Sequence, residues 1–246
     1  MRTSSLETET YFAGAYWGAR KESPGECARR IERLLASIAQ IDPAFAHWFQ
    51  LGKSRKDALK RPIEPKLMEL EALVQKGKDR KFEDLGFSLG GWNGAGDDYD
   101  AAGFSIHCGS YTDVVANSCV IDLPSRGLNS DRVLTSSVLA SLVKCMATAW
   151  EPDSAVAMSS PHLQLIDKGI PFAVLPGWVT YLARHRGAVP PLPAPVSIEP
   201  VEDKGTLIIL TPERFTVANP EHVALAERVR EQLDRAGLLK PLQLQQ

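Results

Sequence analysis

The segment from Leu134 to Trp150 constrains the fold of this chain more than any other. Within it, apolar residues recur at Leu134, Val138, Leu142, Met146 and Trp150. Positions four residues apart lie on one face of a helix, so this spacing predicts a helix. The segment is apolar well beyond that face. A helix that is apolar on most sides must be covered on most sides, and we therefore expect this helix to be the most buried one.

Other segments have the period of a β-strand, with apolar and polar residues in alternation or in short apolar runs. Strands are predicted at residues 11–17, 87–89, 104–108 and 119–123, and a hairpin at 196–201 and 206–210 with its turn at 203–205. The run from residue 172 to residue 182 is also typical of a strand. Pro176-Gly177 interrupts that run and predicts a bulge or a corner there.

Three further helices are predicted from capping signals and amphipathic spacing. Ser-Pro-Gly-Glu at residues 23–26 combines a serine cap, proline at the first helical position and glutamate three residues after the cap. Apolar residues then follow at helical spacing from Cys27 to Ile38. The second of these helices is predicted over residues 65–75, and the third begins at Asn219-Pro220 and ends near Gly237.

The order of these elements indicates the fold class. Strands and helices are mixed along the chain without strict βαβ alternation, which favours an α+β fold over a parallel α/β fold. We predict one domain over residues 11–240, with a largely antiparallel mixed sheet flanked by about four helices. Residues 1–10 are polar for the most part, and we expect them to be disordered or loosely ordered.

Composition excludes several classes of function. The 246 residues contain 28 Lys and Arg against 30 Asp and Glu, and this balance does not indicate a charged partner. There is no basic tract with interleaved aromatics for nucleic acid, no run of roughly 18 apolar residues for a bilayer and no apolar signal-peptide core. The four cysteines are widely spaced, which favours reduced thiols. We therefore expect a cytoplasmic protein that does not bind nucleic acid or membrane directly.

The glycine-rich segment at residues 86–96 is the one candidate for a phosphate-binding loop. It lacks the Gly-Lys-Ser/Thr ending of such loops, and it is followed by Asp97, Asp98, Tyr99 and Asp100, whose negative charge would repel phosphate. The carboxylates also lack the ligand spacing of a calcium loop. Two interpretations stay open, namely a flexible, solvated hairpin loop and an acidic surface loop that docks a partner.

The sequence contains no recognisable catalytic or metal-binding motif. The five histidines are scattered, and none has the spacing of a zinc site. His107 and Cys108 are adjacent on a predicted strand, so their side chains point to opposite faces and cannot serve one site. We predict no catalytic, metal or cofactor-binding residues and no enzymatic activity. The alternative is a small enzyme whose site is assembled from dispersed polar residues.

A series of short motifs gives the chain a more specific resemblance. The first is Trp-Gly-Ala-Arg at residues 17–20, which ends an aromatic strand just before the capped helix. The others are Asp-Pro-Ala-Phe-Ala-His-Trp at 42–48, Leu-Gly-Phe-Ser at 85–88, Trp-Asn-Gly at 92–94, Asn-Ser-Cys-Val at 117–120 and Trp-Glu-Pro-Asp at 150–153. In order and spacing, from about residue 10 to at least residue 210, these motifs resemble the immunity protein 52 family.

This resemblance implies a cognate, antitoxin-like protein of a bacterial polymorphic toxin system. Members of the family look like partners of toxins that carry a restriction-endonuclease-like nuclease domain, some of which are delivered to rival cells by type VI secretion. Such a protein would bind the toxin in the cytoplasm of the producing cell and prevent self-intoxication. The resemblance implies no cofactor, and it leaves the oligomeric state open.

Chemistry, rather than the resemblance, indicates which residues contact such a toxin. A nuclease needs a cationic groove for its phosphate substrate, and an inhibitor can place acidic groups where the phosphates would lie. Asp97, Asp98 and Asp100 are therefore the predicted contact, with Tyr99 as an aromatic anchor. Arg20 follows a strand end, where it can either pair with a buried carboxylate or face the toxin.

Overall fold

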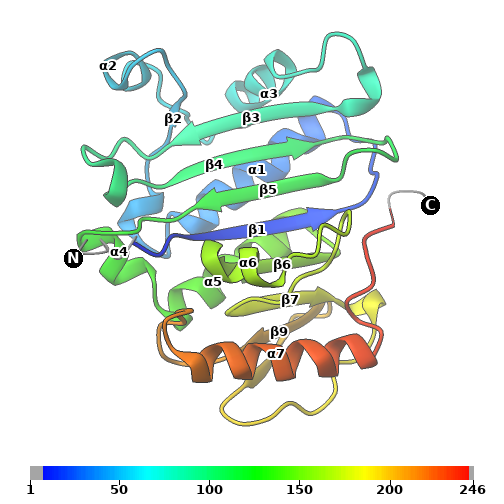
Figure 1. The fold of residues 1–246 in the computed structure, drawn as a ribbon. Coiled ribbons are helices and arrows are strands. Elements are labelled where there is room, and N and C mark those ends of the chain that lie inside the picture. The colour runs from blue at the N-terminus through cyan, green and yellow to red at the C-terminus, as the bar shows by residue number, and fades with distance from the viewer. Residues whose placement is uncertain (1–7, 244–246) are drawn as a thin grey trace.

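The first strand of the chain lies in the middle of the sheet. In a computed structural model that describes residues 8–243, β1 (Tyr11–Trp17) pairs with β5 (Asn117–Asp122) on one side and with β6 (Ser154–Ser159) on the other. The remaining strands are β2 (Phe49–Gln50), β3 (Phe87–Trp92), β4 (Gly103–Cys108), β7 (Val179–Ala183), β8 (Ser197–Val201) and β9 (Gly205–Ile209). All nine form one sheet in the order β2-β3-β4-β5-β1-β6-β7-β9-β8, and each neighbouring pair is antiparallel (Figure 1).

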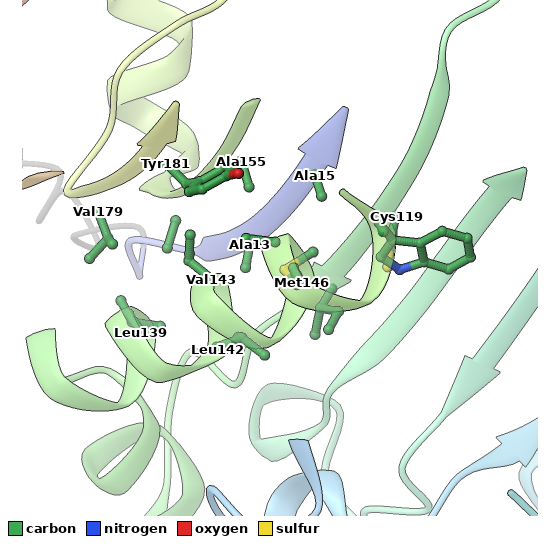
Figure 2. Close-up of a cluster of buried hydrophobic side chains, with 14 of the residues drawn as sticks. Ala13, Ala15, Cys119, Leu139, Leu142, Val143, Met146, Ala155, Val179 and Tyr181 are labelled. Atoms are coloured by element: carbon green, nitrogen blue, oxygen red, sulfur yellow. The ribbon is translucent and has the colours of Figure 1, made fainter. Parts of the chain in front are cut away.

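Helix α5 (Ser136–Trp150) packs across the middle of this sheet (Figure 2). Thr135 caps it, because the Thr135 side chain accepts a hydrogen bond from the Val138 N–H. Its buried side chains include Val143 and Met146, which point toward strand residues such as the small Ala13. Small strand residues let the helix approach the sheet closely. The predicted apolar helix is thus confirmed, and it contributes more buried residues than any other described helix.

The helices cover the two faces of the sheet unequally. Helices α1 (Pro24–Ile38) and α3 (Leu67–Lys76) lie with α5 on one face, whereas α6 (Ser160–Ile166) and α7 (Pro220–Arg235) lie on the other (Figure 1). On that second face no described helix covers β3, β4 and β5. In the part of the chain that the structure describes, no helix combines the length and the apolar character needed to cross a membrane.

The uncovered half of the sheet presents small and polar side chains. Strands β3 to β5 alternate, so that Phe104, Ile106 and Cys119 face the helices and are buried. Their neighbours face away and are exposed or half-buried; they are Ser88, Gly90, Trp92, Ser105, His107, Ser118, Val120 and Asp122. We call this set the open face. It leaves a shallow, mostly uncharged surface on one side of the sheet.

The α+β class and the antiparallel sheet are confirmed, and the four predicted helices correspond to α1, α3, α5 and α7. The basic stretch between Lys53 and Arg61, which is typical of the solvated face of a short helix, contains α2 (Arg55–Ala58). Helices α4 (Leu128–Val133) and α6 were not predicted, and neither were strands β2 and β6. Within the run at 172–182, only the part after Pro176-Gly177 is a strand. Of the N-terminal segment expected to be loosely ordered, residues 1–7 lie outside the described residues.

The interpretation of residues 86–96 as a flexible hairpin loop is wrong for its first half. Strand β3 continues through Gly90 and Gly91 to Trp92, in register with β4. A Cβ atom at Gly91 would lie 2.4 Å from the ring of Phe104, so the missing side chain makes room for that ring. Glycine here serves close packing rather than flexibility.

Candidate partner-binding surface

The acidic segment forms an ordered turn between β3 and β4. Residues Asp98–Asp100 make one turn of 3₁₀ helix, and the Asp97 carboxylate caps it by accepting a hydrogen bond of 2.8 Å from the Tyr99 N–H. The side chains of Asp97, Asp98 and Tyr99 are exposed, with Tyr99 at 53%. The turn therefore holds two carboxylates and one aromatic ring at fixed positions on the surface.

Neighbouring segments hold this turn in place. The Arg55 guanidinium donates hydrogen bonds to the Gly96 carbonyl and to the Asp98 carboxylate. The Arg126 guanidinium lies 4.6 Å from the centre of the Tyr99 ring. The Asp100 carboxylate accepts a hydrogen bond of 2.9 Å from the Asn129 N–H in the first turn of α4. Asp100 is thus used inside the protein, whereas Asp97 and Asp98 remain on its surface.

Beside the turn lies a group of large side chains that we call the Trp92 corner: Phe49, Leu51, Arg55, Leu59 and Trp92. The rings of Phe49 and Trp92 are 6.4 Å apart, and the Arg55 guanidinium lies 6.0 Å from the Trp92 ring. Leu51 is 64% exposed although it lies against Gly90 of the open face. Tryptophan, tyrosine and arginine supply most of the energy at protein interfaces. The acidic turn therefore adjoins a surface with the composition of an interface.

Arg20 lies in a different environment. Its Nη1 donates a hydrogen bond of 2.8 Å to the Trp150 carbonyl, and its Nε is 3.2 Å from the Glu22 carboxylate. Arg30 donates to the same carboxylate, at 2.6 Å, and to the Ala149 carbonyl, at 3.0 Å. The Glu22 side chain is only 7% exposed. Of the two roles expected for Arg20, pairing with a buried carboxylate is the one that the structure shows.

The two arginines also stabilise the end of α5. The last carbonyls of a helix lack partners within the helix, and cations there interact favourably with the helix dipole. Arg20 and Arg30 satisfy the carbonyls of Trp150 and Ala149. Burial lowers the pKa of Arg20, with the nearby Glu22 acting in the opposite direction. The Trp-Gly-Ala-Arg motif thus closes the helix that its own strand packs against.

Arg20 lines a cavity of about 460 Å³ at this end of the sheet, together with Glu151, Asp153, His185 and other residues. Asp153 accepts hydrogen bonds from the Gly18 N–H at 3.0 Å and from His185 at 2.7 Å. A hydrogen bond from Lys204 lowers the pKa of Glu151. Arg186 and Lys240 also line the cavity, so side chains of both charges surround it.

The structure does not bring Arg20 and the acidic turn together. Arg20 follows the Trp17 end of β1, whereas the turn precedes Gly103, which lies beside Asp122 and so at the Phe12 end of β1. About six strand residues separate the two ends, or roughly 20 Å. A standard interface covers about 800 Å² on each partner. One interface can therefore span both places only by crossing the open face.

Sequence reasoning missed a groove on the same side of the sheet. A cavity of about 450 Å³ lies between β1, β5 and the segment at residues 167–178. Its lining includes Tyr16 and Phe172, and Phe172 has a positive φ of 56°. No sequence signal marks such a backbone conformation at a phenylalanine, because only the three-dimensional packing imposes it.

The prediction that His107 and Cys108 point to opposite faces of a strand is confirmed. The two side chains lie on opposite faces of β4, with His107 3.1 Å from the Ser88 hydroxyl. A hydrogen bond with Cys27 and burial raise the pKa of Cys108. Burial raises the pKa of Cys119 to about 12, so this group stays a thiol at neutral pH. Within the described residues, no group of three or more His, Cys, Asp or Glu is placed to hold a metal ion.

Together, these features define an α+β protein with a nine-stranded antiparallel sheet and one half-uncovered face. The same fold is found in a solved structure described as "Pseudomonas aeruginosa T6SS protein PA0821", with a TM-score of 0.55, 12% identity, and coverage of 91% of this chain and 76% of that one. The model of the family described as Immunity protein 52 matches residues 9–242. The chain therefore belongs to the immunity protein 52 family. No curated protein matches the sequence.

Proposed function

We propose that this protein binds and neutralises a cognate toxin in the cytoplasm of the producing bacterium, and that the toxin carries a restriction-endonuclease-like nuclease domain. The match of residues 9–242 to an immunity protein family carries this proposal. The likeness to a type VI secretion protein supports that system as the delivery route. Protection by binding rather than by catalysis is supported by the buried thiols and by the internally paired charges at Arg20.

The acidic turn supports a contact with the substrate site of the nuclease. That site is cationic, because it binds phosphates. Asp97 and Asp98 present carboxylates at fixed positions, and Tyr99 supplies an exposed ring beside them. Opposite charges on the two surfaces speed association, which matters when free toxin is lethal to the producing cell.

The experiment that tests the function is co-expression with the toxin domain encoded by the neighbouring gene. The two proteins are purified together, and nuclease activity is measured on DNA and on RNA as the immunity protein is added. We expect a stable complex, and complete suppression of cleavage at an equimolar ratio. Full cleavage in the presence of excess immunity protein, with no complex, would contradict the proposal.

The contact through the acidic turn is tested separately with Asp97→Asn/Asp98→Asn. Asp100 is left unchanged, because it is half-buried and its carboxylate bonds to the N–H of Asn129. Asparagine at position 97 keeps a side-chain oxygen that can accept the hydrogen bond from the Tyr99 N–H. Glu64→Gln/Glu69→Gln is the matched control, since it removes two exposed carboxylates that also lie near a cation, Lys66. We expect the first variant to lose at least about tenfold in toxin affinity, or about 1.4 kcal/mol, and the control to bind like wild type. Equal affinities for both variants exclude the turn as the contact.

A further inference from the structure

We propose that the groove between β1, β5 and residues 167–178 receives a large apolar side chain of the toxin, flanked in the toxin by a basic residue. This inference rests on the proposed function and names a site on this protein at which the toxin is anchored. We call this feature the β1–β5 groove. The residues that the inference uses are Tyr16, Val114, Ser118, Ile170, Phe172 and Leu175, all of which line the cavity of about 450 Å³.

The size and lining of the groove suit one large apolar side chain or two. Clefts that bury ligands have volumes of roughly 300–1,000 Å³ and mostly apolar walls. A second, narrower cavity of about 90 Å³ shares Tyr16, Ser154 and Leu175 with the groove and extends its apolar lining to Met158. The two cavities therefore share a wall, and together they offer a larger apolar lining beside the sheet.

Large apolar side chains at the rim of the groove are exposed to solvent. Val114 is 67% exposed and Ile170 is 52% exposed, and they come from segments far apart in the sequence. Single exposed apolar residues are common, but apolar residues gathered around a cavity mark binding sites. A partner that entered the groove would cover both side chains.

The wall of the groove contains a strained residue. Phe172 has a φ of 56°, and its carbonyl accepts a hydrogen bond of 2.9 Å from the Leu242 N–H. The left-handed region is unfavourable for a bulky residue, and such strain gathers at ligand clamps. The C-terminal segment thus holds the groove wall in a conformation that the chain would not adopt by itself.

The charges near the groove indicate which kind of toxin residue lies next to the apolar side chain. Asp167 is the one charged residue among the described residues that line the groove, and its side chain is exposed. The adjacent Lys168 is also exposed and lies toward Glu227 of α7, whose main partner is Arg230. A basic residue beside the apolar anchor complements the Asp167 carboxylate, and a nuclease surface that binds phosphate is rich in basic residues.

The test uses variants at the exposed rim, where substitution leaves the core intact. Val114→Asp/Ile170→Asp is compared with Met68→Asp/Ile198→Asp, a control that changes two exposed apolar residues outside the groove. Affinity for the purified toxin domain is measured by titration calorimetry, and folding by circular dichroism. We expect at least a hundredfold loss for the groove variant and less than threefold for the control. Val114→Ile/Ile170→Leu is expected to retain the wild-type affinity, and Asp167→Lys to lose at least tenfold.

Each outcome supports or overturns the inference. Wild-type affinity in the folded groove variant overturns the groove as the anchor, while the proposed function stands because wild type still forms the complex. A wild-type protein that forms no complex overturns the proposed function and, with it, this inference. Sedimentation of the free protein is the remaining measurement. If wild type self-associates, the groove variant does not, and toxin affinity is unchanged, the occupant is a second copy of this chain and the inference is overturned.

Discussion

At the scale of single residues, the motif side chains serve packing before they serve any partner. Trp17 and Trp150 are buried and stack with their ring centres 4.9 Å apart, and Arg20 lies 5.0 Å from the Trp17 ring. The motif of residues 17–20 and the motif of residues 150–153 are thus two halves of one structural unit, and this explains their joint presence in the chain.

His162 gives a prediction about pH at this scale. The side chain is 2% exposed, and burial lowers its pKa from 6.5, while Glu9 and Glu227 oppose this effect. Above about pH 6.5 the imidazole is neutral in both the folded and the unfolded chain and does not change stability. As the pH falls below that value, the unfolded chain binds a proton that the folded chain does not, so the free energy of unfolding decreases.

We therefore expect wild type to lose more stability than His162→Gln between about pH 7.5 and pH 5.5, by up to about 1.4 kcal/mol for each unit of pKa lowering. The measurement is urea unfolding at both pH values. His47→Gln, at an exposed position, controls for the loss of an imidazole. Parallel losses in wild type and His162→Gln would show that His162 is not responsible.

At the scale of elements, long amphipathic helices were predictable from sequence and most short elements were not. Helices α4 and α6 contain 6 and 7 residues, which is too short for a helical period to be visible. Strand β6 is buried at all six positions, so it lacks the alternation of apolar and polar residues that marks a strand with one solvent-exposed face. Its small residues resemble a loop in sequence, and only the strands on both sides explain its conformation.

The start of α1 gives a prediction at the element scale. The Ser23 side chain accepts a hydrogen bond from the Glu26 N–H, and the Glu26 carboxylate accepts one from the Ser23 N–H at 2.7 Å. Ser23→Ala is expected to lower the free energy of unfolding by about 1 kcal/mol. Ser37→Ala, in the last turn of the same helix, is the control and is expected to have little effect. Denaturant titration of both variants checks this, and equal losses would mean that the cap does not stabilise the helix.

At the scale of the whole molecule, sequence reasoning predicted the fold class but not the arrangement of the site. The five predicted contact residues divide between the two ends of β1, because strand pairing between distant segments decides which loops share an end. The β1–β5 groove was beyond prediction for the same reason. It joins Tyr16, Val114 and Phe172, which are far apart in the sequence.

Charge gives a prediction at this scale. The net charge of the chain is only −2, so long-range attraction depends on where the charges lie rather than on their sum. We expect the association rate with the toxin domain to fall about tenfold as salt shortens the Debye length from about 10 Å to about 3 Å. Asp97→Asn/Asp98→Asn is expected to show a shallower dependence. Stopped-flow fluorescence measures these rates. Identical salt dependence in both proteins would show that the turn does not contribute to the electrostatic attraction of the toxin.

The central position of β1 also determines how early the sheet can form during synthesis of the chain. This strand leaves the ribosome first, but its partners β5 and β6 begin at Asn117 and Ser154. At about 5–20 residues per second, β1 stays unpaired for on the order of ten seconds after it is synthesised. The middle of the sheet can therefore close only when more than half of the chain exists. If the protein has the proposed function, a producing cell is protected by the molecules that are already complete, because chains still in synthesis have not yet formed the sheet.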